Sequence, residues 1–171
     1  MVASQDAGAF GELIRRHQSQ VRNFLRKLSR DEALADDLAQ DCFLHAWNKI
    51  HTYSGTGSFI GWVLKIAYTT FLQSKRKSKR YNEILEQAGH ESDRSAVTSH
   101  STPETELDLD TLLGALNEQE RLIMIFSYAC GLSHREISET TELPAGTVKS
   151  IIHRAKEKIR TQFEIDDHQY G

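Results

Sequence analysis

The residues of this chain best suited to chemistry are charged and hydroxyl side chains, which gather in three stretches. The first is KRKSKR, Lys75 to Arg80, in which five of six residues are basic. So many cations exceed what the negative end of a helix attracts, and phosphate neutralisation explains the excess better. Aromatic residues precede the run, and exposed rings stack on the bases of unpaired strands. The stretch therefore predicts binding to single-stranded or melted nucleic acid.

The second stretch is GTVKSIIHRAKEKIR, Gly146 to Arg160, whose apolar residues recur at helical spacing. At about 100° per residue, Val148, Ile152 and Ala155 fall on one buried side of a helix. The other side carries groups that bind phosphates or base edges in the major groove of a duplex, and a glycine that permits close backbone approach. These candidate residues are Gly146, Lys149, Ser150, His153 and Arg154.

The third stretch is acidic and belongs to a predicted helix that begins near Asp31. Its apolar stripe runs from Leu34 to Ile50, and its opposite side is polar. Acidic residues near a helix N-terminus are favoured by the helix dipole, so the residue pattern alone favours a solvated face over a binding face. The polar side consists of Asp36, Asp37, Gln40 and Asp41.

Three amphipathic helices are expected to position the first and third stretches. Apolar residues recur at spacings of three and four from Phe10 to Leu28, from Leu34 to Ile50 and from Phe59 to Phe71. The turn HTYSGTGSF joins the second helix to the third and presents hydroxyl groups and Tyr53. The third helix is expected to end in the basic run.

Helix start and stop signals in the last part of the chain predict a helix-turn-helix. NEQE, which begins at Asn117, and SHRE, which begins at Ser133, are capping boxes that each open a helix. Gly131 provides a stop between these helices, and Pro144 opens a third. In a helix-turn-helix the second helix enters the major groove, so the stretch from Gly146 is predicted to read duplex DNA.

The formal net charge of −3 conceals a segregation of charge along the chain. Residues 1–82 hold 13 Lys and Arg against 7 Asp and Glu, residues 83–110 hold 1 against 8, and residues 111–171 hold 7 against 9. A basic front part is a surface that a polyanion can bind, although the average charge of the chain argues against one.

The acidic middle is rich in Ser, Thr and Glu and has few large apolar side chains, so it cannot bury enough surface to offset the entropy of ordering. We expect a flexible acidic linker over residues 82–106. The predicted fold class is all-α, with two small helical domains at residues 1–81 and 107–171, the second a helix-turn-helix.

Other chemistry has weak support in this sequence. Cys42 and His45 have a helical spacing that a metal site can use, but no further pair completes a ligand set. No phosphate loop or nucleophile motif is present, and no cofactor is expected. Cys42 and Cys130 lie in apolar patterns and are expected to be reduced and buried. No signal peptide or membrane-spanning stretch is recognised, which favours the cytoplasm without membrane insertion.

The motifs together resemble a bacterial sigma factor. ADDLAQDCFLHAW, SFIGWVLKIA and the basic run look like sigma region two, and GLSHREISETTELPAGTVKSIIHRAKEKIR looks like region four. Two such regions joined by a short linker are similar to the extracytoplasmic-function (ECF) group. The resemblance covers roughly residues 9–80 and 108–161.

The resemblance implies partners for each stretch. The acidic helix would bind core RNA polymerase through Asp36, Asp37, Gln40 and Asp41, which reverses the preference for a solvated face. The final helix would read the minus-thirty-five element of promoter DNA, and an anti-sigma factor would be a further partner. The residues that would bind the melted non-template strand at the minus-ten element are Tyr53, Ser54, Ser58, Trp62, Lys65, Lys75 and Arg76.

The sequence departs from the family pattern at four positions, three of which, Tyr68, Thr69 and Ile151, keep a decoy function open as one of two alternatives. Tyr68, Thr69, Gln73 and Ile151 stand where the family has other residues. Ile151 replaces a frequent arginine and lies beside the predicted buried stripe, so it is expected to add packing and to remove a phosphate contact. The alternatives are a stand-alone helix-turn-helix regulator, and a sigma-like decoy that binds polymerase without initiating.

Overall fold

The computed structural model of this chain describes residues 6–55, 58–88 and 111–163. These residues are helices and short connections, and no strand occurs among them. The chain divides into two compact units, Met1–Ser99 and His100–Gly171. The division falls inside the segment predicted as a linker, of which residues 89–106 lie outside the described part. The all-α class with two helical domains is confirmed.

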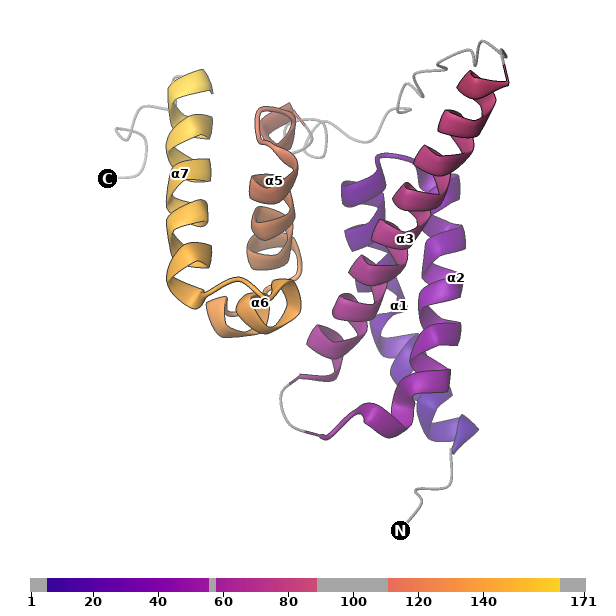
Figure 1. The fold of residues 1–171 in the computed structure, drawn as a ribbon. Helices are drawn as coiled ribbons and strands as arrows, with labels where there is room; N and C mark the ends of the chain where they lie inside the picture. Colours follow the sequence, from indigo (N-terminus) through magenta and orange to yellow (C-terminus); the bar gives the residue numbers. More distant parts are fainter. Residues whose placement is uncertain (1–5, 56–57, 89–110, 164–171) are drawn as a thin grey trace. The chain divides into compact units, whose positions relative to one another are not determined.

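The first unit is a bundle of three helices around one core (Figure 1). The helices are α1 (Ala7–Ser29), α2 (Glu32–Lys49) and α3 (Phe59–Gln87), and the short 3₁₀ turn η1 (Ile50–Thr52) follows α2. Each helix turns its predicted apolar stripe inward. The largest fully buried side chains of this unit are Val21, Phe24, Leu25, Cys42, Val63 and Leu64.

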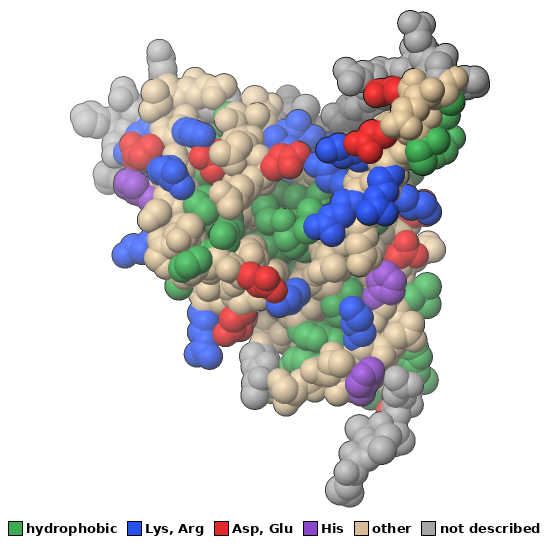
Figure 2. Space-filling view, viewed as in Figure 1, with side chains coloured by type: hydrophobic (Ala, Val, Ile, Leu, Met, Phe, Trp, Pro, Cys, Tyr) green, Lys and Arg blue, Asp and Glu red, His purple; other side chains and the backbone are tan. Residues whose placement is uncertain are grey.

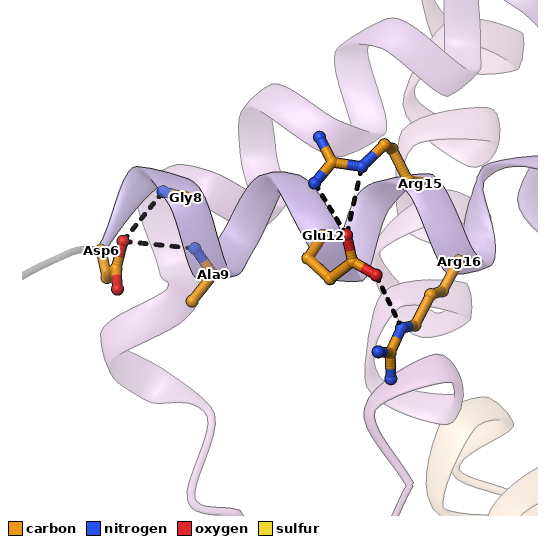
Figure 3. A network of polar contacts seen from close by, with 6 residues as sticks. All are labelled: Asp6, Gly8, Ala9, Glu12, Arg15 and Arg16. Carbon is orange, nitrogen blue, oxygen red and sulfur yellow. Dashed lines mark hydrogen bonds and ion pairs between the residues drawn. The ribbon is translucent and has the colours of Figure 1, made fainter.

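The beginning of α1 is fixed by local polar contacts (Figure 3). The Asp6 carboxylate accepts hydrogen bonds from the backbone N–H groups of Gly8 and Ala9, at 2.9 and 3.2 Å. One turn later, the Glu12 carboxylate accepts from Arg15 and Arg16. These two hydrogen bonds hold the pKa of Glu12 below its usual value. Because Glu12 pairs with both arginines within the helix, this end of α1 is a capped helix start held by local contacts.

Helix α3 is longer than the sequence pattern predicted. The pattern placed its end in the basic run, but the helix continues to Gln87, beyond the predicted domain boundary at residue 81. Residues 82–87 are mostly good helix formers, and Lys79 and Glu83 form an i,i+4 ion pair at 4.0 Å. The described part of α3 runs past the ends of α1 and α2 (Figure 1). The start of the predicted linker is therefore helical.

The second unit contains the predicted helix-turn-helix. Residues 111–114 are helical, and the helices that follow are α5 (Glu118–Met124), α6 (His134–Thr141) and α7 (Ala145–Phe163). Both capping boxes are present: the Asn117 side chain accepts from the Glu120 N–H, and the Ser133 side chain accepts from the Glu136 N–H. The buried apolar residues that close this core include Phe126, Ile137, Val148, Ile151 and Ala155.

A π-helical turn, Ile125–Ala129, lies between α5 and the loop before α6. The sequence pattern predicted an ordinary helix through this run. The Cys130 N–H donates to the Ile125 carbonyl at 3.0 Å, five residues back, as a π turn requires. Gly131 follows with a φ of +68°, a conformation that glycine adopts without a steric penalty. The predicted stop at Gly131 is confirmed, whereas the π turn was missed.

Candidate functional site

The acidic side of α2 forms a polar row on the surface of the first unit. Asp37, Gln40 and Asp41 are all exposed and lie within slightly more than one turn of the helix. Leu44, one turn further on, is 62% exposed. The row therefore offers carboxylate and amide groups beside one exposed apolar side chain.

Asp36, the fourth residue of this predicted set, has a different environment. Its Oδ1 lies 3.8 Å from the Arg22 Nε of α1 and is shielded from solvent without a hydrogen-bond partner among the described residues. Its side chain is only 45% exposed. The structure thus separates Asp36, which lies against α1, from the three exposed residues of the row.

A shallow apolar groove of about 530 Å³ adjoins the same row. Phe10 of α1 and Trp47 of α2 form its floor, with ring centroids 5.0 Å apart. Gln40 and Leu44 line the groove and also belong to the polar row, so the row and the groove form one continuous surface. The remaining lining residues are Ala7, Gly11 and Phe43.

Aromatic rings gather where η1 and the start of α3 meet. Tyr53 packs edge-on against Phe59, with 5.6 Å between ring centroids, and lies 5.4 Å from Trp62. His17 of α1 lies 5.7 Å from Phe59. Each of these side chains is half-buried. The structure brings the predicted residues Tyr53 and Trp62 together, and it adds Phe59 and His17, which the sequence reasoning did not name as site residues.

The two predicted serines beside this cluster differ in their surroundings. The Ser58 hydroxyl accepts from the Gly61 N–H at 3.1 Å and so forms the N-cap of α3. Ser54 is exposed. The Ser58 hydroxyl therefore fixes the start of α3.

The predicted cations of α3 extend from the aromatic cluster along the helix. Lys65, one turn after Trp62, is exposed, and Arg76 lies three turns further on the same side. The Lys75 ammonium lies 5.6 Å from the centroid of the Phe71 ring, on a neighbouring side of the helix. All five basic residues from Lys75 to Arg80 are exposed. Figure 2 shows Lys and Arg side chains gathered over this part of α3.

The outward face of α7 carries the predicted duplex-reading residues. Gly146, Lys149, Ser150, His153 and Arg154 are all exposed, while Val148, Ile152 and Ala155 are buried. A Cβ built at Gly146 meets nothing within 4 Å, so packing does not require glycine there. The Ser150 hydroxyl donates to the Gly146 carbonyl at 2.9 Å, which leaves its oxygen able to accept a hydrogen bond. The face is thus arranged as the helical wheel predicted.

Ile151 is 1% exposed and belongs to the core of the second unit. The expected packing role of this departure from the family pattern is confirmed. On the outward side, the sequence reasoning overlooked Lys156 and Arg160, which are exposed and lie at i+7 and i+11 from Lys149. Their spacing is the signal that would have found them.

The described residues contain no group of three or more His, Cys, Asp and Glu side chains that could hold a metal ion. The two cysteines are buried and unpaired with each other, as expected. Burial raises the pKa of Cys42 to about 12, which makes it an inert thiol. No helix in the described ranges has the length and apolar character needed to cross a membrane.

Comparisons with known protein families agree with this architecture. Residues 13–81 match the family described as sigma-70 region 2, and residues 106–159 match sigma-70, region 4. The first match covers most of α1, all of α2 and most of α3, and the second covers the helix-turn-helix through most of α7.

Similar proteins cover nearly the whole chain. It is 29% identical to the ECF RNA polymerase sigma-E factor of Haemophilus influenzae, over 95% of this chain and 92% of that protein. It is 26% identical to the ECF RNA polymerase sigma factor RpoE of Cereibacter sphaeroides, over 91% and 87%. Among solved structures, the Bartonella quintana sigma factor RpoE in complex with the anti-sigma factor NepR shares the fold, with a TM-score of 0.74 at 23% identity over 92% of this chain and 98% of that one.

Each of the two matching regions falls within one of the two compact units. The chain therefore belongs to the sigma-70 family, as an ECF-type RNA polymerase sigma factor associated with transcription initiation.

Proposed function

We propose that this chain binds core RNA polymerase and directs it to promoters whose minus-ten element it opens. The observation that carries the proposal is the separation of two kinds of surface within the first unit. One side of the bundle presents the carboxylates of α2, and α3 presents rings followed by cations. A protein that binds nucleic acid alone has no need of the first surface.

Core polymerase would bind the row Asp37, Gln40 and Asp41 together with the adjoining groove. Exposed carboxylates guide the approach of a basic partner surface, and the exposed Leu44 side chain gives an apolar anchor inside the contact. Asp36 would support this surface from beneath, because its carboxylate lies against Arg22 of α1.

The melted non-template strand would bind the aromatic cluster and the cations that follow it. Tyr53 and Trp62 offer half-buried rings on which unpaired bases stack, and Ser54 offers a hydroxyl at the edge of the cluster. Lys65, Lys75 and Arg76 lie further along α3, where they would neutralise phosphates of the strand as it leaves the cluster.

The minus-thirty-five duplex would bind the outward face of α7. Lys149 and Arg154 suit phosphates and guanine acceptors, and Ser150 presents hydroxyl lone pairs to a base-edge donor. Gly146 allows the helix N-terminus to approach the duplex backbone closely. The chain itself would supply no catalytic group, because polymerase performs the synthesis. Since bacterial polymerase acts in the cytoplasm, the proposal places the chain there.

The decisive experiment is reconstitution with core polymerase, followed by transcription from a library of promoters with mapped start sites. We expect co-purification with core polymerase and transcripts that begin at a defined distance from a shared motif. Sequence-specific duplex binding without any assembly with core polymerase would favour the stand-alone regulator, whereas non-specific binding at low salt is expected of any cationic DNA-binding face. Polymerase binding without any transcript would favour the decoy.

Charge reversal tests the polymerase surface directly. We expect Asp37→Lys with Asp41→Lys to weaken assembly with core polymerase by at least about tenfold, since an opposed charge pair at an interface is lost and replaced by repulsion. The matched control reverses Glu83 and Glu86 of α3, which changes the net charge equally in the same unit. Equal effects of the two double variants would refute a specific acidic surface.

An anti-sigma partner is proposed from the solved neighbours. Besides the complex with NepR, CnrH has been solved in complex with the cytosolic domain of CnrY, and its fold matches this chain with a TM-score of 0.68 at 23% identity over 93% of this chain and 90% of that one. A comparable partner for this chain would compete with core polymerase. Its presence is tested by identifying proteins that co-purify with the full chain and block transcription on addition.

A further inference from the structure

The outward face of α7 divides into two rows of side chains. Residues Gly146, Ser150, Arg154 and Glu157 lie on one row and are chemically mixed. The other row repeats at spacings of four, three and four residues, so its members lie above one another on the helix. This second row consists of Lys149, His153, Lys156 and Arg160, all exposed.

Lys156 and Arg160 differ in the group that lies beside their positive charge. Arg160 Nη1 lies 3.2 Å from the Glu157 carboxylate, which partly neutralises it. Among the described residues, no carboxylate lies within ion-pair distance of Lys156; its ammonium instead lies 5.3 Å from the centroid of the Tyr128 ring. A ring face attracts a cation without neutralising it. Lys156 therefore keeps its full charge while its long side chain is held on one side.

Tyr128 comes from the π turn Ile125–Ala129 and is 58% exposed. A π turn closes its hydrogen bond one residue later than an α turn, which changes the direction of the side chains it carries. Such turns occur often at functional sites. Because a tyrosine this exposed contributes little to the core, its contact with Lys156 is the clearest use of its position.

We propose that Tyr128 is a positioning residue for promoter binding, which holds the Lys156 ammonium on the row Lys149, His153, Lys156 and Arg160 so that it contacts a phosphate of duplex DNA. The proposal rests on the proposed reading of duplex DNA by α7. It adds a residue outside the recognition helix and a phosphate contact that extends the row by two turns beyond Lys149. A lysine held in advance loses less conformational freedom on binding than a free one.

The test uses the full chain and a fluorescent 30-base-pair duplex of mixed sequence, because a phosphate contact needs no particular sequence. Binding is measured between 50 and 200 mM KCl for the wild type and for Lys156→Met, Tyr128→Leu and Tyr128→Phe. The logarithm of the binding constant falls linearly with the logarithm of salt concentration, and loss of one phosphate contact reduces the magnitude of this negative slope by about 0.9. We expect that reduction for Lys156→Met.

For Tyr128→Leu we expect affinity to fall by about two- to fivefold, the worth of an exposed cation–π contact, with a partial fall in slope. Tyr128→Phe keeps the ring and should behave as the wild type. In the double variant, Tyr128→Leu should add nothing to Lys156→Met. Tyr81→Leu is the matched control, since Tyr81 is 62% exposed on α3, and its effect should add independently to that of Lys156→Met.

Four results would overturn the proposal: a Tyr128→Leu variant that binds as the wild type, additive effects of Tyr128→Leu and Lys156→Met, an unchanged slope for Lys156→Met, or no duplex binding by the wild type at 50 mM KCl. Unfolding curves of each variant separate a loss of contact from a loss of fold. The proposed sigma-factor function is tested by polymerase-dependent transcription in a different experiment, so a failure of that function can be told apart from a failure of the role proposed for Tyr128.

Discussion

The contact between Glu120 and Lys158 joins the start of α5 to the last part of α7, and its removal has a predictable cost. The Lys158 ammonium lies 2.8 Å from the Glu120 carboxylate, whose side chain is 6% exposed while that of Lys158 is 50% exposed. In Lys158→Met the carboxylate stays buried and keeps the Asn117 N–H, 3.1 Å away, as a donor. A hydrogen bond to a charged group contributes about 1.5–3 kcal/mol. We expect a loss of about 2 kcal/mol in the free energy of unfolding of the second unit, below the cost of breaking a fully buried pair, since Lys158 is half in water.

Urea unfolding of the full chain measures this loss with an internal reference. Trp47 and Trp62, the two tryptophans of the chain, lie in the first unit, so fluorescence follows that unit and far-UV circular dichroism follows both. With a slope of about 1–2 kcal/mol per molar urea for a small domain, the midpoint of the second unit should fall by about 1–2 M. The fluorescence midpoint should stay where it is.

Two further variants sharpen the test. Lys149→Met removes an exposed lysine from the same helix and should change stability by no more than about 0.5 kcal/mol. Adding Glu120→Gln to Lys158→Met removes the buried charge and should restore part of the loss, because an amide is less costly to bury than an unpaired carboxylate. An unchanged second midpoint in Lys158→Met, or a double variant as unstable as the sum of the single changes, would refute the reasoning.

Further predictions concern the second unit and one thiol. Burial raises the pKa of Glu120, but the bonds from Lys158 and the Asn117 N–H outweigh it, so the pKa lies below the ordinary 4.5. The stability that the ionised Glu120 contributes is present above pH 4.5 and is lost as the pH falls through the lower pKa that Glu120 has in the folded chain. Acid unfolding followed by circular dichroism should show this loss, and the free energy of unfolding should depend less steeply on pH in Glu120→Gln. Glu142 has a φ of +62°, so Glu142→Gly should stabilise the unit by about 1 kcal/mol, seen as a higher melting temperature. Gly146→Ala meets no obstacle and should leave the melting temperature unchanged or raised while weakening binding of the holoenzyme to promoter duplex. With a pKa of about 12, Cys42 should resist N-ethylmaleimide at pH 8 in the native chain and react once unfolded, as mass spectrometry would detect.

The helices and their caps were predictable because the signals are local. Apolar spacing identified the inward faces of α1, α2 and α7, and the capping boxes at Asn117 and Ser133 marked two helix starts. The end of α3 was placed too early because the acidic composition of the middle segment was given more weight than its first residues. The run from Asn82 to Gln87 consists mostly of helix formers and is followed closely by Gly89, a local signal for the helix end observed.

The π turn was not predictable from the same patterns, because its residues keep an apolar spacing compatible with an ordinary helix. The structure shows five residues, Ile125 to Ala129, in this turn. Two backbone hydrogen bonds end this turn: the Cys130 N–H donates to the Ile125 carbonyl, and the Leu132 N–H donates to the Phe126 carbonyl. Such closure depends on how the following loop packs, which periodicity does not describe.

Within the candidate site, a helical wheel gives the side of a helix but not what its neighbour supplies. It grouped Asp36 with Asp37 and Asp41 because all three leave the apolar stripe of α2. Arg22 of α1 lies beside Asp36, a contact between residues fourteen positions apart that the wheel of α2 cannot contain. Likewise His17 reaches the aromatic cluster from another helix. Contacts across helices were therefore the part that required the structure.

The position of α7 also depends on contacts with other segments, which a helical wheel does not contain. Lys156 and Lys158 are two residues apart and so lie about 200° apart around the helix, on opposite flanks of it. Each contacts a residue of the preceding segment: Lys158 contacts Glu120 at the start of α5, and Lys156 contacts Tyr128 in the π turn at its end. Rotation of α7 about its own axis in either direction would stretch one of these contacts. Because the outward row that includes Lys149 lies beside the flank of Lys156, the two contacts add to the buried stripe of Val148, Ile151 and Ala155 in setting the direction in which the helix presents its cations.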